Sequence, residues 1–221
     1  MKTSNREKTY KIALVAMFAA LSAIGAFIRV PMPMVPFTLQ LFFTTMAGLL
    51  LGGELGALSV GVYVLLGLLG IPVFTGGGGF SYVLQPSFGY LLGMIPGAFV
   101  TGKLTQTKDG KPGWIRIILA CYAGLMMVYL VGVPYLYMVC RFHLDKIIGF
   151  RVLLLDYFLT FMPADAIKMV LATIVGYRLI PVLRKLMNEI RERAGDLSID
   201  RNVKKILDAF MERSDERAKG E

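Results

Sequence analysis

The stretch "WIRIILACYAGLMMVYLVGVPYLYMV" (residues 114–139) decides the class of this protein, because Arg116 is its only charged residue. A membrane-spanning helix needs about 20 consecutive, mostly apolar residues. The whole chain has the same bias, since 56% of its 221 residues are hydrophobic and 18% are charged. Soluble domains contain about 45–50% apolar and about 25% charged residues. The composition therefore predicts an integral membrane protein.

Five further apolar segments accompany this one. The six expected spans are residues 11–28, 36–52, 55–72, 86–104, 114–139 and 158–182. Connections rich in proline, glycine and charge separate them, and the second and third spans are expected to form a tight helical hairpin. The predicted fold class is an all-α membrane protein with six transmembrane helices. Residues 1–182 form its membrane domain, and residues 183–221 form a charged cytoplasmic tail whose apolar residues suit short amphipathic helices.

The basic residues predict the orientation of the spans. Of the 24 Lys and Arg residues, 19 lie at the two termini and in the connection between the fourth and fifth spans, four lie on the opposite side, and Lys168 lies within the last span. Cytoplasmic segments carry the excess of Lys and Arg. We therefore expect both termini inside and the loops 29–36 and 73–86 outside. The net charge of +9 follows from this topology and does not indicate a nucleic-acid partner.

The sequence offers little to catalysis or metal binding. Cys121 and Cys140 have no CxxC spacing and are expected to be buried thiols, and His143 is the single histidine. The stretch "GAFVTGKL" (97–104) fits G-x-x-x-x-G-K but has Leu104 where the magnesium-binding hydroxyl should be. Paired carboxylates and a nucleophile–histidine arrangement are also lacking. We expect no catalytic residue, no metal, no cofactor and no ATPase activity in this chain.

The stretch "FMPADAIKMV" (161–170) places two ionisable residues, Asp165 and Lys168, inside the last span. Each costs about 2.5–3.5 kcal/mol at a bilayer centre on insertion scales. Residues three apart share one helix face, with Cβ atoms about 5–6 Å apart. One interpretation is an ion pair that neutralises itself within the bundle. The other, which we favour, is a ligand site, because ionisable residues inside membranes usually mark function.

The expected topology places this pair in the outer half of the bundle, beneath two uncharged loop segments. These are "PFTLQ" (36–40) and "FTGGGGFSYVLQPSFGY" (74–90), whose aromatic and small polar residues suit a small-ligand pocket. The candidate substrate-binding residues are Asp165, Lys168, Tyr90, Gln40, Thr38, Phe37, Phe74 and Ser87. We expect the four-glycine run to let the backbone close over a ligand.

The first span carries two pairs of small residues at a spacing of four. Within "ALVAMFAALSAIGA" (13–26) these are Ala16 with Ala20 and Ala19 with Ala23. Such spacing lets another helix approach closely. That helix is either part of the same bundle or part of a membrane partner.

Four stretches together resemble the BioY family, the biotin-specific substrate-binding (S) components of energy-coupling factor (ECF) transporters. They are "VPFTLQ" (35–40), "GIPVFTGGGG" (70–79), "LQPSFGYLLG" (84–93) and "PADAIK" (163–168). The resemblance covers residues from about 11 to about 180. It implies a six-helix S-component fold in a prokaryotic cell membrane, with a high-affinity biotin site near the outer face.

The resemblance also assigns roles to residues. Asp165 and Lys168 match the Asp and Lys of the family's last helix. Either alanine pair matches the motif that meets the ECF transmembrane subunit, which works with two ATPase subunits. The chain departs from many relatives in reading Pro-Ser-Phe-Gly-Tyr at 86–90 where they read Pro-Thr-Gly-Gly-Tyr. The alternative to a biotin-binding subunit is a self-sufficient, proton-coupled transporter that uses Asp165.

Overall fold

The computed structural model describes residues 5–32, 35–107, 112–145, 149, 151–152 and 155–218 of the chain; beyond residue 190 it describes backbone and the side chain of Glu192. The chain separates into two compact units. One comprises Ala13–Pro181, and the other comprises Met1–Ile12 with Val182–Glu221.

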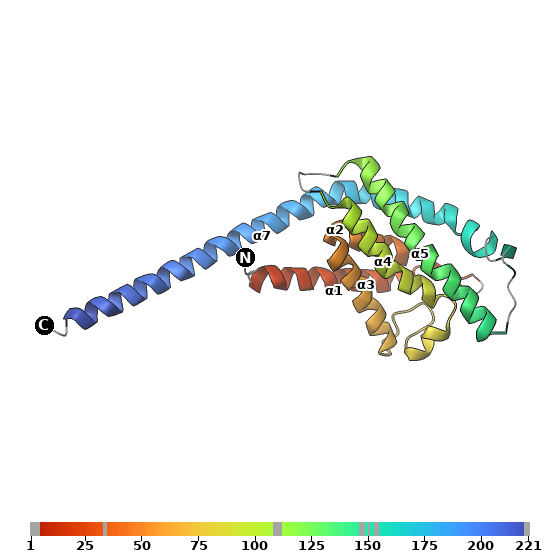
Figure 1. Ribbon diagram of the computed structural model, residues 1–221, viewed down its shortest axis with the longest axis horizontal. Helices are drawn as coiled ribbons and strands as arrows, with labels where there is room; N and C mark the ends of the chain where they lie inside the picture. The colour runs from red at the N-terminus through yellow and green to blue at the C-terminus, as the bar shows by residue number, and fades with distance from the viewer. Residues whose placement is uncertain are drawn as a thin grey trace. The chain divides into compact units, whose positions relative to one another are not determined.

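The described chain is mostly helical (Figure 1). Its helices are α1 (Asn5–Phe27), α2 (Gln40–Leu51), α3 (Gly53–Leu68), α4 (Phe88–Thr105), α5 (Trp114–Phe142) and α7 (Met162–Ala218). Its shorter elements are the strands β1 (Arg29–Val30) and β2 (Phe37–Thr38), the 3-10 helix η1 (Phe80–Leu84) and the π-helix η2 (Leu155–Leu159). Each expected span overlaps one of the helices.

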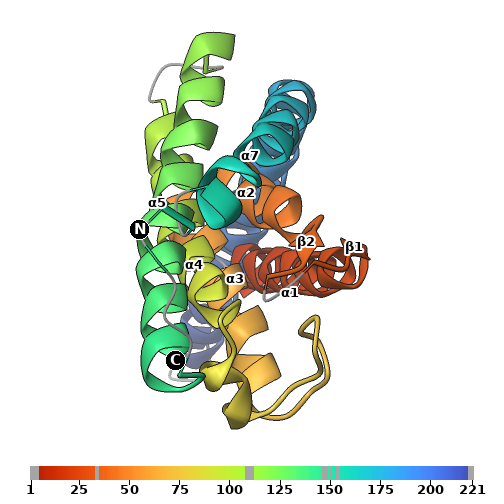
Figure 2. The ribbon, with the colours of Figure 1, turned by 90° about the vertical axis from the view of Figure 1, so that its right-hand side faces the viewer.

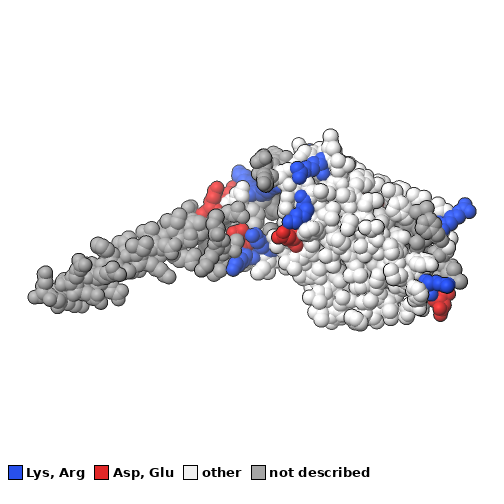
Figure 3. All heavy atoms as spheres, in the orientation of Figure 1, with Lys and Arg blue, Asp and Glu red and all other residues white. Residues whose placement is uncertain are grey.

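Helix α4 lies at the centre of the Ala13–Pro181 unit. It packs along α5 on one side and against α2 and α3 on the other (Figure 2). In the described part of the whole chain, three helical segments are long and apolar enough to cross a membrane, namely Glu7–Phe27, Trp114–Phe142 and Met162–Ile190. Figure 3 shows a broad uncharged surface on this unit, with the charged side chains towards its ends. This surface is the one expected against lipid.

The expected hairpin of the second and third spans is confirmed, and glycine makes it possible. Helix α2 ends at Leu51 and α3 begins at Gly53, so Gly52 alone joins them, with a φ of 83° that favours glycine. A Cβ on Gly48 would lie 2.4 Å from the carbonyl oxygen of Ala98, so the absence of a side chain lets α2 approach α4. The hydrophobic effect does not drive helix association in lipid, so close packing of this kind is what holds the helices together.

The segment after residue 182 differs from the expectation of short helices. Helix α7 continues as one helix through Pro181 to Ala218. A proline removes one backbone hydrogen bond, but the Arg, Lys, Glu and Leu residues that follow it are good helix formers. In the unit that holds this segment, Lys11 pairs with Glu7 at 2.8 Å across one turn of α1.

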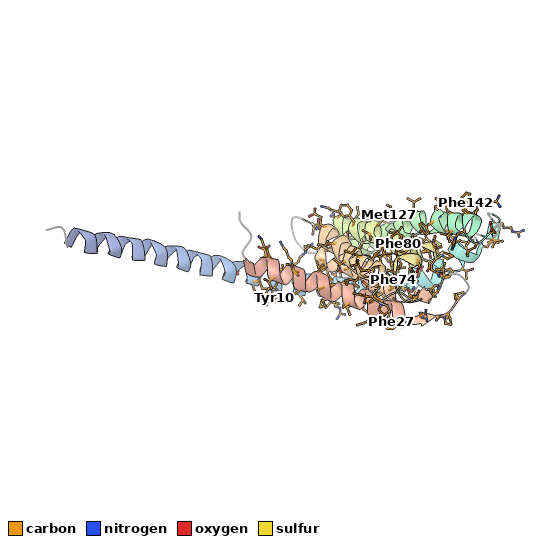
Figure 4. All side chains as sticks on the ribbon, turned by 90° about the horizontal axis from the view of Figure 1, so that it is seen from below. Tyr10, Phe27, Phe74, Phe80, Met127 and Phe142 are labelled. Atoms are coloured by element: carbon orange, nitrogen blue, oxygen red, sulfur yellow. The ribbon has the colours of Figure 1, made fainter. Side chains whose placement is uncertain are left out.

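Two connecting loops meet at one end of the Ala13–Pro181 unit. Strands β1 and β2 pair antiparallel, with Arg29 opposite Thr38. The Arg29 guanidinium donates a hydrogen bond to the carbonyl oxygen of Thr75 in the glycine-rich loop. That loop is anchored by Phe74, which is 1% exposed and labelled in Figure 4, and whose ring contacts Tyr82 at a centroid distance of 4.5 Å. The two loops therefore support each other.

The expectation for the cysteines is confirmed. Cys121 and Cys140 are buried and form no disulfide. Among the described residues, no group of three or more His, Cys, Asp or Glu is placed to hold a metal ion.

Candidate ligand-binding site

A cavity of about 50 Å³ lies where α7 begins, between the β1–β2 connection, α2, α4 and α5. Its lining residues are Val35, Pro36, Phe37, Thr38, Leu41, Tyr90, Met94, Val128, Tyr129, Phe161, Asp165 and Lys168. A single water needs about 10–15 Å³ of cavity volume, so the cavity has room for a few waters. Most of its wall is apolar, its two charged residues lie on α7, and hydroxyl-bearing residues lie on β2, α4 and α5.

The start of α7 positions the two charged residues. Asp165 lies in the first turn of the helix, where the unpaired backbone N–H groups favour a negative charge. Asp165 and Lys168 are 7% and 6% exposed, and the Lys168 Nζ lies 2.7 Å from the Asp165 Oδ1. The predicted pairing at i and i+3 is confirmed, and it lies at the N-terminal end of α7.

The second carboxylate oxygen has a partner that the sequence analysis did not single out. The Tyr129 hydroxyl, on α5, donates a hydrogen bond of 2.6 Å to the Asp165 Oδ2. The available signal was a tyrosine inside an apolar span, because a buried tyrosine hydroxyl usually finds a partner. The sequence does not say which partner, since 36 residues separate the two.

The ammonium of Lys168 also reaches the β1–β2 connection. It donates a hydrogen bond of 2.6 Å to the carbonyl oxygen of Thr38 and lies 3.5 Å from the centroid of the Phe37 ring. A cation above an aromatic face in a desolvated site contributes about 2 kcal/mol. Lys168 therefore holds strand β2 against α7, and any ligand group that accepts a hydrogen bond from the Lys168 ammonium competes with the Thr38 carbonyl.

Aromatic rings form the apolar part of the wall. The ring of Tyr129 makes edge contacts with Tyr90 at 6.1 Å and with Phe158 at 5.0 Å. The ring centroids of Phe37 and Phe161 lie 6.3 Å apart in another part of the wall. Flat rings of this kind suit a compact ring system in the ligand.

The structure brings together five of the eight candidate binding residues: Asp165, Lys168, Tyr90, Thr38 and Phe37. Gln40, Phe74 and Ser87 are not among the lining residues. Gln40 is buried at the start of α2, and Ser87 shares a hydrogen bond of 3.3 Å with the Tyr82 hydroxyl. The Phe74 ring fills the space beside Gly67, where a Cβ would lie 2.0 Å from it. Phe74 and Ser87 thus support the segment between α3 and α4, whereas Gln40 is a buried residue whose Nε2 has no hydrogen-bond partner among the described residues.

The apolar lining residues of α4 and α5, Met94 and Val128, were also missed. Their residue types are the same as those that face lipid elsewhere in these spans. No sequence signal separates the two environments when helices are apolar on all sides.

The alanines of α1 separate into two environments. Ala16 and Ala20 are exposed. Ala19 is 4% exposed, and Ala23 is partly buried against the core. Ala19 and Ala23 therefore belong to internal packing, and the exposed pair remains available to another helix.

The described fold and cavity define a mostly helical membrane protein with a candidate small-ligand site beside the β1–β2 connection. The chain belongs to the BioY family, whose model matches residues 1–185. It is 42% identical over 179 residues to a probable biotin transporter BioY of Lysinibacillus sphaericus, with 81% of this chain and 91% of that protein covered. It is 38% identical over 164 residues to a biotin transporter BioY of Thermotoga maritima, with 74% and 91% covered.

A solved structure resembles the chain along most of its length. The crystal structure of the S-component for biotin from an ECF-type ABC transporter covers 80% of this chain and 94% of its own, with 30% identity and a TM-score of 0.68. The chain therefore shares the fold of an S-component. Residues 186–221 lie beyond the match to the family model.

Proposed function

We propose that this chain is the high-affinity biotin-binding subunit of a vitamin-uptake transporter in a prokaryotic cell membrane, with six spanning helices and both termini inside. The observation that carries the proposal is the buried network of Asp165, Lys168 and Tyr129 on the wall of a cavity bordered by the β1–β2 connection. Ionisable residues inside membrane spans are rare and usually mark function, so a buried network of this kind supports a ligand site. Relatives named as biotin transporters supply the ligand class.

The chemistry of biotin suits these residues. Its fused rings carry a cyclic urea with two N–H donors and one carbonyl acceptor, and a carboxylate ends its alkyl chain. The Asp165 carboxylate can accept an N–H, and the Lys168 ammonium can donate to the carbonyl. The aromatic wall formed by Phe37, Tyr90 and Tyr129 provides apolar contact for the fused rings.

The cavity of about 50 Å³ has room for a few waters, and its enlargement on ligand binding is part of the proposal. The β1–β2 connection and its flanking strands form the part of the wall with the shortest regular structure, because each strand has only two residues. Its contact with α7 through Lys168 and Thr38 is one that a ligand carbonyl can replace.

The proposed partner is an ECF module of one transmembrane subunit and two ATPase subunits, which supplies the ATP hydrolysis. The exposed Ala16 and Ala20 support a contact with the transmembrane subunit, because small residues four apart permit close helix approach. The proposal gives this chain no catalytic role and no cofactor.

Biotin titration of the purified, detergent-solubilised chain by calorimetry tests the proposal. We expect saturable binding with one site, and a melting temperature that rises with biotin concentration, since a ligand of the folded state stabilises it. A vitamin without a cyclic urea serves as the control and should change neither signal. A helical, monodisperse preparation that shows no heat of biotin binding contradicts the proposal.

A further inference from the structure

We propose that Tyr129 contacts the ligand directly: its hydroxyl oxygen accepts one N–H of a cyclic urea while Asp165 accepts the other. This assignment rests on the proposed function and gives the site an added specificity-determining residue. Tyr129 lines the cavity beside Asp165, and its hydroxyl lies 2.6 Å from the Asp165 Oδ2.

The direction of that hydrogen bond carries the assignment. An ionised carboxylate can only accept, so the Tyr129 hydroxyl must donate its one proton to Asp165. A phenolic oxygen whose O–H already donates a hydrogen bond to one neighbour still has lone pairs. Towards any third group it therefore acts as a hydrogen-bond acceptor. Tyr129 and Asp165 therefore offer adjacent acceptors to the cavity, and neither offers a proton.

Lys168 is the third member of this hydrogen-bonded network on the wall. Lys168 is donor-only, and its Nζ lies 2.7 Å from the other oxygen of Asp165. The network thus presents two kinds of acceptor, phenolic and carboxylate, together with one donor. A cyclic urea presents two donors and one acceptor, which is the complementary set. A ligand with acceptors in place of the two N–H groups would leave buried polar groups unpaired.

The surroundings hold the Tyr129 hydroxyl in place. The ring is fixed by edge contacts with Tyr90 on α4 and with Phe158 on η2. Replacement by phenylalanine keeps both ring contacts and removes one oxygen atom. Tyr122 is a matched control, because it lies on the same helix and its hydroxyl donates a hydrogen bond of 3.4 Å to α7, at the carbonyl oxygen of Ala166. Tyr122 is not among the cavity-lining residues.

The test compares the parent chain, Tyr129→Phe and Tyr122→Phe in detergent, by biotin titration and by thermal melting without ligand. We expect the Kd for biotin to rise at least tenfold in Tyr129→Phe and to stay within twofold of the parent in Tyr122→Phe. A parent-like Kd in a folded Tyr129→Phe variant overturns the assignment and leaves the proposed function standing. A parent chain that binds no biotin refutes the proposed function itself.

Two biotin analogues, each methylated on one of the two ureido nitrogens, separate direct contact from an effect through Asp165. We expect the parent to bind both at least tenfold more weakly than biotin. The Tyr129→Phe variant should bind one of the analogues almost as tightly as it binds biotin. That analogue lacks the N–H that Tyr129 accepts in the parent, and the mutation has already removed this hydrogen bond. Equal further losses for both analogues overturn direct contact. Parent-like binding of either analogue also overturns it, and this arm needs no mutant to fold.

Discussion

The ion pair at the start of α7 gives the sharpest test of the reasoning, through Lys168→Met. This change removes the cation and keeps a flexible apolar side chain of similar length. It leaves Asp165 buried with a single described partner, the Tyr129 hydroxyl. It also deprives Thr38 of its hydrogen bond and Phe37 of the cation above its ring.

The expected cost follows from these losses. Breaking a buried ion pair on one side costs about 3–5 kcal/mol, because a charge remains without compensation. For a chain of this size, about 1 kcal/mol changes the melting temperature by roughly 2–4 °C. We therefore expect the ligand-free Lys168→Met variant to melt roughly 6–20 °C below the parent.

The double change Asp165→Leu with Lys168→Met removes both charges together. It should recover much of the loss, since no charge is stranded. Recovery should be incomplete, because the Tyr129 hydroxyl loses its acceptor, and a buried unsatisfied group costs about 1–3 kcal/mol. Adding Tyr129→Phe should therefore raise the melting temperature again. The triple variant should be the most stable of the three, and biotin should not raise its melting temperature.

Thermal melting of the four proteins in one detergent, with and without biotin, is the assay. The reasoning is refuted if Lys168→Met melts with the parent, or if the double variant melts below Lys168→Met. If the double or triple variant keeps the full biotin-induced rise, the pair serves structure alone and the site lies elsewhere.

Three further variants test ligand binding, partner coupling and internal packing separately. Asp165→Asn replaces an acceptor oxygen by a donor and should weaken biotin binding by about 1.5–3 kcal/mol, the value of a charge-assisted hydrogen bond, as measured by calorimetry; an unchanged Kd would remove Asp165 from the ligand contacts. Ala16→Trp with Ala20→Trp should leave biotin affinity intact and abolish co-purification with an ATPase module, because the bulky rings occupy an exposed face of α1. Ala19→Trp is the contrast, since Ala19 is 4% exposed, and it should lower the melting temperature of the ligand-free chain; loss of binding in the Ala16/Ala20 variant would instead place that pair in the internal packing.

The sequence predicted the parts of this protein that local patterns determine. Among the described residues, hydropathy located helices α1 to α5 and the first part of α7, because each is a mostly apolar segment. Helical spacing alone paired Asp165 with Lys168. The extent of α7 was not predicted. Pro181 and the change to a charged composition indicate the end of a helix there, but α7 continues through this point.

The rest of the site depends on contacts between residues far apart in the sequence. Lys168 reaches the Thr38 carbonyl across 130 positions, and Tyr129 reaches Asp165 across 36. Phe74 and Phe37 are both aromatic residues in loops, yet one ring supports the glycine-rich loop and the other lies over the Lys168 ammonium. Residue type and position in a loop do not specify which way a ring points, so only the packed fold distinguishes these roles.

The two interpretations of the charged pair, structural neutrality and ligand binding, are compatible in this geometry. Both oxygens of Asp165 and the ammonium of Lys168 already have partners within the protein. A urea carbonyl that binds Lys168 in place of the Thr38 carbonyl exchanges one hydrogen bond for another, so that contact alone contributes little to affinity. Net affinity must then come from ligand N–H groups that occupy unused lone pairs, and from fused rings that cover aromatic surface. Within the protein alone, the charges of Asp165 and Lys168 are already paired, and lone pairs on Asp165 and Tyr129 can still accept ligand N–H groups.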